Sequence, residues 1–505
     1  MGVLLDRRGH VHAVMVGDPR AVFLPDLTAH RRGRDRLCGL RLVHTHLNHE
    51  ALTDDDLTDL ALLRLDLVAA VEVLETGLPG AVFQAHLLPD NERGLPWEIL
   101  PPVSVHDLAD DFTAMIASLE DEILRHRRPR LAGDNRDRAI LVHVSRGTAT
   151  EAEDSLAELR ELARSAGIAV VHEVSQRRPV DPKFVMGKGR LQDTVIKAMQ
   201  LGAEVLVFDL NLSATQVAGI ANYTDLKVLD RTQVILDIFA QHAQTREGKI
   251  QVELAQLRYL LPRLGAKHTA MSRLTGGIGG RGPGETKLEV NRRRAQDRIA
   301  QLTREVKKLG RRRRLRRAAR TRKELPTIAV VGYTNAGKST LLNNLTHSAV
   351  TVQNTLFATL NPVSRRLRFP REREVIITDT VGLIRNVPKD LMDAFRTTFE
   401  ELHEADVLLH VMDAAAHDIE WQWDAVRDLL AQLELDFKPI VTVLNKMDLC
   451  PPERLRGLAD NYRGVPICAR DPATFGPLLE AIEAALWPRE RAPVPHKQNM
   501  ADVHG

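Results

Sequence analysis

Apolar positions in the first quarter of the chain fall into two patterns. Residues 2–24 alternate short Val and Leu runs with turn signals, which predicts hairpin strands. Dense Leu, Val and Ala behind Thr53, a candidate N-cap, predict a helix over 54–74. Residues 126–138 are rich in Arg, Pro, Gly and Asp and are interpreted as a linker. The first unit is therefore an α+β extension over residues 1–125.

Strand-like and helix-like patterns alternate over residues 139–230. The predicted strands cover 140–144, 168–174 and 204–208, and the predicted helices cover 151–165 and 191–200. This alternation is typical of strands joined by crossover helices. We expect a small parallel α/β unit here.

The pattern becomes helical over residues 231–325, with one interruption. Leucines recur at helical spacing within 251–261, a glycine-rich run occupies 276–284, and helical character resumes at Glu285. We expect a long two-helix arm with a glycine-rich, arginine-containing tip.

From Pro326 to Trp487, apolar strands and helices alternate again. This pattern predicts a doubly wound α/β domain over 326–488, followed by a disordered tail over 489–505. The whole chain is expected to be a multidomain α/β protein.

Composition narrows the class of protein. The 505 residues are too many for one core, and 44% apolar with 27% charged residues is typical of soluble globular proteins. No segment has the pattern of a signal peptide. No apolar run approaches the length of about 20 residues that a membrane span needs. Three scattered cysteines suit neither a disulfide framework nor a metal site. We expect a monomer in a reducing cytoplasm.

Basic residues are concentrated in one block. The net charge is only +3, yet nine of the thirteen residues over 311–323 are Arg or Lys. Such a block favours local contact with a polyanion, most often nucleic acid, with a solvated helix as the alternative.

A glycine-rich motif follows the predicted strand over 327–331 and precedes a predicted helix. This setting is that of a phosphate-binding P-loop, in which Gly332 and Gly337 let N–H groups turn toward phosphates. Lys338 would neutralise β- and γ-phosphate oxygens, and the Ser339 hydroxyl would bind Mg²⁺. The predicted nucleotide-binding residues of this segment are Gly332, Tyr333, Thr334, Asn335, Ala336, Gly337, Lys338, Ser339 and Thr340.

A second apolar strand ends in Asp379, with Gly382 three residues further on. Asp379 fits the carboxylate that holds Mg²⁺ through water, and Gly382 fits the residue whose N–H meets the γ-phosphate. The intervening segment 354–362 is the predicted first switch. Thr359 is favoured over Thr355 as a further Mg²⁺ ligand, although spacing alone does not decide between them.

A third motif indicates guanine rather than adenine. Asp448 can accept from guanine N1–H and the N2 amine, which adenine does not offer, so an adenine nucleotide would leave the carboxylate unpaired. Asn445 is expected at the guanine N7/O6 edge and Lys446 over the sugar. The Ala469 N–H is expected to reach guanine O6, with Cys468 in the place of the usual serine.

The residue after the Asp-x-x-Gly motif bears on hydrolysis. Many small GTPases place a water-orienting glutamine there, whereas this chain has Leu383. Slow intrinsic turnover is therefore expected. Asn335 is a candidate ligand for a K⁺ ion beside the phosphates, and a simple turn residue is the equally weighted alternative.

Segments inside and outside the predicted nucleotide domain resemble the HflX family of translational GTPases. The matching segments are 332–341, 356–360 and 379–385 inside it, and 230–240, 245–257 and 281–289 outside it. The resemblance covers about residues 140–488, and many members lack the first 135 residues. Cys468 and the short region after the domain depart from the family pattern.

This resemblance implies binding of GTP and GDP, binding to the large (50S) ribosomal subunit and its rRNA, and GTP-dependent splitting or rescue of stalled ribosomes under stress. It also implies that the arm tip reaches toward the peptidyl-transferase region. The candidate rRNA contacts are Arg281, Arg311, Arg312, Arg313 and Arg314. A GTPase of large-subunit assembly is the alternative. It is disfavoured because the additional RNA-binding modules of such factors are missing.

A histidine pattern stands out in the N-terminal extension. His44, His46 and the acidic run ending in Asp56 are similar to the zinc motif of JAMM/MPN metalloproteases. Alternation on a strand points both histidines to one face. No glutamate occurs in residues 1–49 to act as the base, and Leu47 replaces the usual proline. The pattern therefore favours a metal-free, degenerate relative over a zinc isopeptidase.

Overall fold

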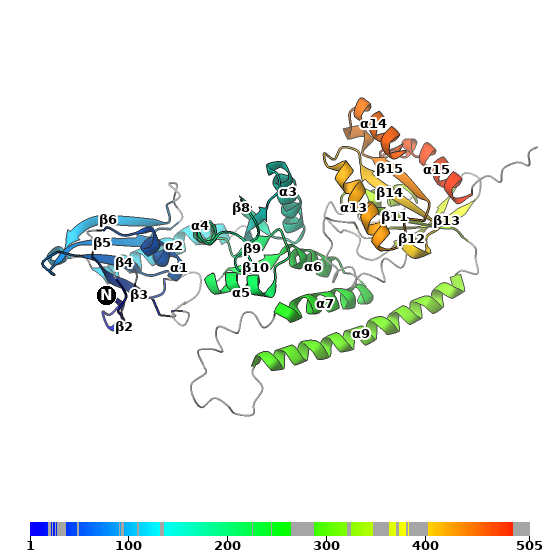
Figure 1. Cartoon of the computed structure of the whole chain (residues 1–505). Helices are drawn as coiled ribbons and strands as arrows, with labels where there is room; N and C mark the ends of the chain where they lie inside the picture. The colour runs from blue at the N-terminus through cyan, green and yellow to red at the C-terminus, as the bar shows by residue number, and fades with distance from the viewer. Residues whose placement is uncertain are drawn as a thin grey trace, which may run out of the picture. The chain divides into compact units, whose positions relative to one another are not determined.

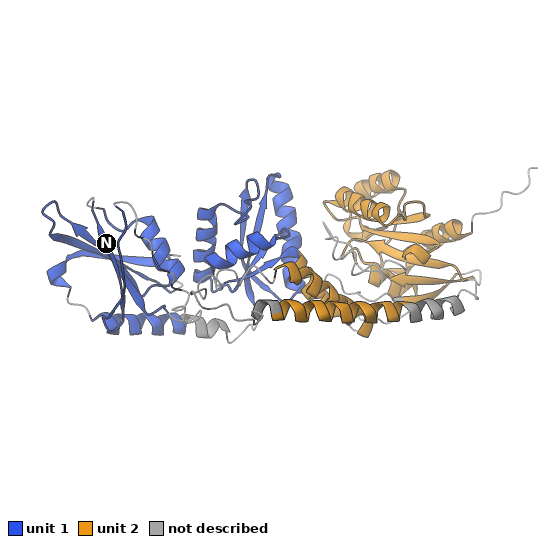
Figure 2. Ribbon diagram, turned by 60° about the horizontal axis from the view of Figure 1, so that its bottom comes forward, with its two compact units in different colours: residues 1–231, 265–280 blue, residues 232–264, 281–505 orange. Residues whose placement is uncertain are grey.

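The computed structural model of the chain describes residues 1–18, 22, 24, 25, 27, 37–47, 50–89, 91, 95–108, 111–131, 136–224, 226–243, 245–263, 287–320, 325–346, 363–369, 373–379, 382 and 402–487. It divides into two compact units, residues 1–231 with 265–280 and residues 232–264 with 281–505, which Figure 2 shows in different colours. Within the part of the chain that the structure describes, no helix combines the length and apolarity needed to cross a membrane.

A six-stranded mixed sheet forms the N-terminal part of the first unit (Figure 1). Its order is β2-β1-β3-β4-β5-β6, with β3 and β4 parallel and the other pairs antiparallel. The elements are β1 (Gly2–Asp6), β2 (Val11–Met15), β3 (Leu40–His46), α1 (Asp54–Leu63), β4 (Leu67–Val73), β5 (Pro79–Leu87), β6 (Trp97–Ser104), a 3-10 turn (Val105–Asp107) and α2 (Phe112–Leu131). The hairpin predicted over 2–24 is present as β1 and β2. Leu4, Leu60 and Ile116 join sheet and helices in one core.

The helix predicted over 54–74 is wrong in its second half. α1 ends because Arg64 adopts a left-handed conformation with φ of 53°. β4 follows, pairs with β3 on one side and β5 on the other, and is buried from Leu67 to Ala70. A strand covered on both faces is apolar at successive positions, so its sequence resembles that of a buried helix.

The linker predicted over 126–138 is also wrong in part. α2 continues to Leu131 and the next strand begins at Arg138, while residues 132–135 lie outside the described ones. Ile116 and Leu119 anchor the helix in the core.

One edge of this sheet is formed by β6, which contains Pro101 and Pro102. Proline lacks the N–H that a central strand would need on both sides, so this sequence fits an edge.

The second sheet has four parallel strands in the order β10-β9-β7-β8. Its elements are β7 (Arg138–Ser145), α3 (Ala149–Ser165), β8 (Ala169–Arg177), α4 (Lys188–Gln200), β9 (Val205–Phe208), α5 (Ala214–Tyr223) and β10 (Lys227–Asp230). Ile140, Leu206 and Phe208 are fully buried in its core. The predicted parallel α/β unit is therefore confirmed.

Polar side chains gather at the carboxyl ends of β7 and β9. The buried Asp209 carboxylate accepts from Ser155 Oγ at 2.6 Å and from Arg231 Nη1 at 2.7 Å, and it lies 2.8 Å from His143 Nδ1. Arg231 also pairs with Glu158 at 2.7 Å. Buried charges are tolerated when they are paired in this way, so the cluster is an internal anchor of the sheet.

Two long helices pack together at the start of the second unit (Figure 1). The helical elements are α6 (Arg231–His242), α7 (Arg246–Leu260), a 3-10 turn (Leu261–Arg263) and α9 (Lys287–Arg320). Ile250 and Leu254 of α7 pack against Leu302 of α9, and Glu253 pairs with Arg298 at 2.7 Å. The predicted pairing of two helices is present, whereas the glycine-rich tip over 276–284 lies outside the described residues.

The last sheet has the order β12-β13-β11-β14-β15-β16, with β12 antiparallel to β13 and the other pairs parallel. Its elements are β11 (Thr327–Gly332), α10 (Lys338–Leu345), β12 (Val363–Arg368), β13 (Glu374–Asp379), β14 (Val407–Asp413), α13 (Ile419–Gln432), β15 (Ile440–Asn445), a 3-10 turn (Met447–Leu449), α14 (Pro452–Tyr462), β16 (Val465–Pro466), a 3-10 turn (Pro472–Thr474) and α15 (Gly476–Leu486). The strand order reverses at β11, and ligands of such sheets bind at the carboxyl end of the strand where this happens. The predicted tail over 489–505 lies outside the described residues.

Candidate nucleotide site

The loop between β11 and α10 occupies this reversal point. β11 is buried from Ile328 onward, as a central parallel strand must be. Gly332 and Gly337 have φ of 153° and 93°, values that favour glycine. A β-carbon on Gly332 would clash with the carbonyl oxygen of Val411, and one on Gly337 would clash with the amide of Asn445. The loop therefore needs both glycines for its backbone conformation and for its close contact with β14 and β15.

Lys338 is buried at the start of α10. Its Nζ donates to the carbonyl oxygens of Gly332 at 3.0 Å and Tyr333 at 2.7 Å. Burial lowers the pKa of Lys338 to about 8, although the nearby Asp379 carboxylate opposes this shift. A group of negative phosphates would stabilise the charged form, so the loop is built to accept an anion.

Ser339 and Asp379 lie at the ends of neighbouring elements. The Ser339 hydroxyl donates to Asp379 Oδ2 at 2.7 Å, and the Asp379 side chain is 1% exposed. Asp379 ends β13, which pairs in parallel with β11 and so brings the carboxylate to the phosphate loop. A hydroxyl and a carboxylate form an oxygen donor set that fits Mg²⁺.

Gly382 is buried against the same loop. A β-carbon there would lie 2.8 Å from Thr334 Cγ2 and 3.1 Å from Lys338 Nζ. The structure therefore places Gly382 beside Lys338, the residue predicted to bind phosphate.

Asn445 joins three segments of the site. Its Nδ2 donates to the Ala336 carbonyl at 2.7 Å, and its Oδ1 accepts from the Ala469 N–H at 2.8 Å. The sequence predicts guanine O6 as the partner of the Ala469 N–H, and the structure gives it Asn445 instead. Both polar ends of the Asn445 side chain have protein partners, so its first role is to position the loops.

Lys446 and Asp448 come after Asn445 in the chain, and their side chains lie in different environments. Lys446 has a left-handed backbone with φ of 61°, and its Nζ pairs with Asp413 Oδ2 at 2.6 Å. Asp448 is exposed rather than buried, so its carboxylate faces solvent where a base can reach it. Cys468 is half-buried, and its N–H donates to Thr474 Oγ1 at 3.1 Å.

Some predicted site residues cannot be placed. Thr355, Thr359, Leu383 and Arg281 lie outside the described residues, and α9 contains Arg311–Arg314 without a description of their side chains. Asn335 is described: it is exposed and has φ of 62°. The predicted nucleotide-site residues that the structure describes are Gly332, Tyr333, Thr334, Asn335, Ala336, Gly337, Lys338, Ser339, Thr340, Asp379, Gly382, Asn445, Lys446, Asp448, Cys468 and Ala469.

Sequence reasoning missed three supporting residues. Asp413 ends β14 directly opposite Asn445 in the strand register, and a strand ending in Asp was the signal for it. Asn344 Nδ2 donates to the Ala469 carbonyl at 2.6 Å. His410 is buried in β14 and stacks on Trp423 with ring centroids 5.1 Å apart.

A phosphate loop, a hydroxyl–carboxylate pair and an Asn-Lys-x-Asp turn on a doubly wound sheet define the class of P-loop GTPases. Three family models match the chain: "GTP-binding GTPase N-terminal" over 153–240, "GTP-binding GTPase Middle Region" over 242–320 and "50S ribosome-binding GTPase" over 327–446.

Proteins named GTPase HflX are similar to the chain over much of its length. The protein of Caldanaerobacter subterraneus subsp. tengcongensis is 42% identical over 354 residues, which are 70% of this chain and 81% of that protein. The Lacrimispora saccharolytica protein is 46% identical over 69% of this chain and 83% of its own length, and the Escherichia coli protein is 41% identical over 63% and 74%. The chain belongs to the HflX family and is a GTPase.

Among solved structures, the chain is similar to a GTP-binding protein from Sulfolobus solfataricus in complex with GDP. The identity is 23%, the TM-score is 0.37, and the match covers 69% of this chain and 98% of that chain.

Proposed function

We propose that this GTPase binds the large (50S) ribosomal subunit and, in its triphosphate form, separates the subunits of stalled ribosomes. The printed description of the family model over 327–446 supports the ribosomal target. The observation on this chain that carries the proposal is the charge of α9.

α9 has 34 residues, which corresponds to a length of about 50 Å at about 1.5 Å per residue. It contains fifteen Lys and Arg residues and three Asp and Glu residues, and Arg292, Arg293 and Arg294 are exposed on it. A helix with such an excess of positive charge fits the phosphates of a folded RNA and binds them in a salt-dependent way.

The basic helix is held by α7 rather than standing alone. Leu302 is 1% exposed and packs against Ile250 and Leu254. The Glu253–Arg298 ion pair lies on the surface and adds little stability of its own. Apolar packing therefore fixes the direction of α9, while Arg292 and Arg294 are exposed on it.

The nucleotide site supplies the switch in this proposal. Lys338 would hold the β- and γ-phosphates, Ser339 and Thr359 would bind Mg²⁺, and Asp379 would hold it through water. Mg²⁺ supplies charge neutralisation on the phosphate oxygens. The Gly382 N–H meets the γ-phosphate, so that loss of this phosphate releases the segment that follows.

Guanine selection in this proposal rests on Asp448, which accepts from the N1–H and the N2 amine. Asn445 holds the loop that carries Asp448 in register with the phosphate loop. Leu383 cannot orient water, so we propose that Asn335 and a K⁺ ion, or a group of the ribosome, stabilise the charge that develops during hydrolysis.

Sucrose-gradient sedimentation of 70S ribosomes tests the proposal. Full-length protein is added with GTP, a non-hydrolysable GTP analogue or GDP, and the subunits are resolved. Separation into 30S and 50S with GTP or its analogue, and not with GDP, is expected. Binding to free 50S subunits without any separation would instead favour a role in large-subunit assembly, and no ribosome binding in any state would overturn the proposal.

A further inference from the structure

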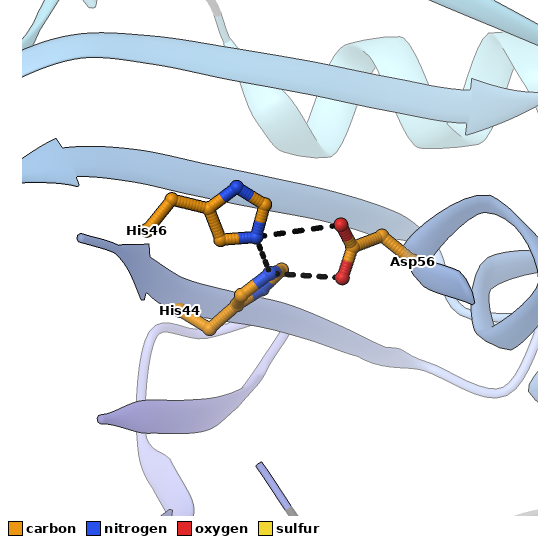
Figure 3. Close-up of side chains that lie close together, drawn as sticks. All are labelled: His44, His46 and Asp56. Carbon is orange, nitrogen blue, oxygen red and sulfur yellow. Dashed lines mark hydrogen bonds and ion pairs between the residues drawn. The ribbon is translucent and has the colours of Figure 1, made fainter. Parts of the chain in front are cut away.

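Three side chains of the N-terminal sheet converge on one point. His44 and His46 are two residues apart on β3 and so share a face, and Asp56 lies in the first turn of α1. Figure 3 shows the two imidazole rings and the carboxylate pointing toward one another. The three side chains are between 6% and 15% exposed, so they are shielded from most of the solvent.

The separations between their polar atoms are informative. His44 Nε2 lies 2.9 Å from His46 Nε2 and 3.0 Å from Asp56 Oδ1, and His46 Nε2 lies 3.4 Å from Asp56 Oδ2. Ligands held tetrahedrally at about 2.0–2.1 Å from a zinc ion are about 3.3 Å apart. The three atoms are therefore spaced like one face of such a tetrahedron.

Neighbouring groups orient the ligand atoms. His46 Nδ1 lies 3.0 Å from the carbonyl oxygen of Glu50, which can only accept, so Nδ1 carries the proton and Nε2 of the neutral ring presents its lone pair. Asp56 Oδ2 accepts from the Thr53 N–H at 2.8 Å and from the Thr53 hydroxyl at 2.7 Å. These contacts hold the carboxylate so that Oδ1 faces His44.

Without a cation, only protons on the imidazoles can hold these three atoms together. One proton on His44 Nε2 can be donated to His46 or to Asp56, and the lone pair of His46 then still faces a carboxylate. His44 Nδ1 is itself buried without a hydrogen-bond partner among the described residues. A divalent cation at the centre is attracted to all three atoms at once.

We propose that His44 Nε2, His46 Nε2 and Asp56 form a binding site for a divalent transition-metal ion of the zinc type. Two imidazole nitrogens with one carboxylate suit Zn²⁺, whereas Mg²⁺ and Ca²⁺ prefer oxygen ligands alone. Three protein ligands leave a fourth position for water or another small ligand.

The proposal is limited to binding of the ion, and no hydrolytic step is assigned to the site. The metal would join β3 to the start of α1, two elements that already share a hydrophobic core through Leu42 and Leu57. This inference does not depend on the ribosomal function.

Zinc uptake by the full-length chain tests it. The protein is stripped with a chelator and given excess Mg²⁺ and GDP to fill the nucleotide site. Zn²⁺ is then added in competition with a chromophoric chelator. The wild type is expected to bind one Zn²⁺ per chain, and His46→Asn and Asp56→Asn are each expected to bind it at least ten-fold more weakly.

His86→Asn is the matched control. The His86 side chain is 12% exposed, like that of His46, but it lies on β5 beside Glu98. This variant is expected to bind Zn²⁺ like the wild type. Circular dichroism and thermal midpoints in the presence of chelator verify that all three variants fold.

Two results would overturn the site. One is a wild type that takes up no Zn²⁺, which leaves a hydrogen-bonded histidine–aspartate cluster only. The other is equal Zn²⁺ binding by wild type, His46→Asn and Asp56→Asn. Co²⁺ gives a second readout: tetrahedral d–d bands lost in both variants support the site, and a thiolate charge-transfer band places the metal at a cysteine instead.

Discussion

The amide nitrogen of Asn445 lies 2.2 Å from the position that a β-carbon on Gly337 would take, and the same nitrogen donates to the Ala336 carbonyl at 2.7 Å. The strand end predicted to select the base and the predicted phosphate loop are thus in direct contact through one side chain. The protein itself therefore joins the two ends of the predicted nucleotide site.

Asn445→Ala is expected to weaken GDP and GTP binding at least ten-fold. The substitution leaves the buried Ala336 carbonyl and Ala469 N–H without their partner, at about 1–3 kcal/mol for each group. Calorimetric titration measures the loss. Asn461→Ala, at an exposed position of α14, serves as control and is expected to bind like the wild type.

Asp448→Asn is expected to change the base preference of the site from guanine to xanthine. The asparagine amide can donate to the extra carbonyl of xanthine, whereas it cannot accept from both guanine donors. Displacement of a fluorescent nucleotide by GDP or XDP measures the change, with GDP affinity falling and XDP affinity rising by at least ten-fold. Unchanged selectivity would show that Asp448 does not contact the base.

His410 is expected to make the GTPase domain less stable in mild acid. Burial, with a smaller effect of Lys338 and Arg427, lowers its pKa from 6.5 to about 3. At pH 5, His410 binds a proton in the unfolded chain but not in the folded domain. Its contribution to the free energy of unfolding is therefore fully present above pH 6.5 and is lost as pH falls toward 3. The loss from pH 7 to 5 is about 2 kcal/mol.

His410→Phe keeps an aromatic ring against Trp423 and removes the titrating group. The denaturation transition that shifts on addition of GDP identifies the GTPase domain. This transition is expected to depend less on pH between 7 and 5 in the variant. Equal pH dependence of both proteins would assign the effect to other groups.

Leu302→Ala is expected to weaken 50S binding while GTP binding stays unchanged. Leu302 is buried between α7 and α9, and removal of such a side chain costs about 2–5 kcal/mol of local packing. α9 then loses its fixed direction. Co-sedimentation with 50S subunits measures binding, and Glu253→Ala, which removes only an exposed ion pair, is expected to bind within about two-fold of wild type.

Hydrolysis is expected to be faster in K⁺ than in Na⁺ buffer if Asn335 helps to hold a cation. Its exposed position and φ of 62° are compatible with this role and with that of a turn residue. Phosphate release in the two buffers distinguishes them. Equal rates would exclude the cation, and an Asn335→Ala variant with undiminished K⁺ stimulation would exclude Asn335 as its ligand.

Local constraints explain which parts of the site could be predicted from sequence. Gly332, Gly337 and Lys338 are fixed by one strand–loop–helix segment, so their spacing alone indicates a phosphate site. The Asn445 contacts could not be predicted, because Ala336 is 109 residues away and Ala469 is 24 residues away in the chain. Such pairs are created only by the order of the strands.

The fold could be predicted where the apolar positions of an element repeat with one clear period. The parallel unit over 139–230 was recognised because strands and amphipathic helices alternate there. The segment 54–74 was not, because Leu67–Ala70 is apolar at every position and the chain reverses at Arg64 without a glycine. The parallel pairing of β3 with β4, which α1 connects, brings His44 near α1. The sequence pattern allowed this arrangement but did not establish it.

Pro101 and Pro102 on β6 affect how the N-terminal sheet meets other chains. A sheet ends in a row of free backbone donors and acceptors that can recruit a foreign strand. N–H groups alternate along a strand, so one of two adjacent prolines removes a donor from that row. This border is therefore poorly suited to fibril growth or strand exchange. Replacing both prolines with valine would restore backbone donors and make this edge better able to pair with a strand of another chain.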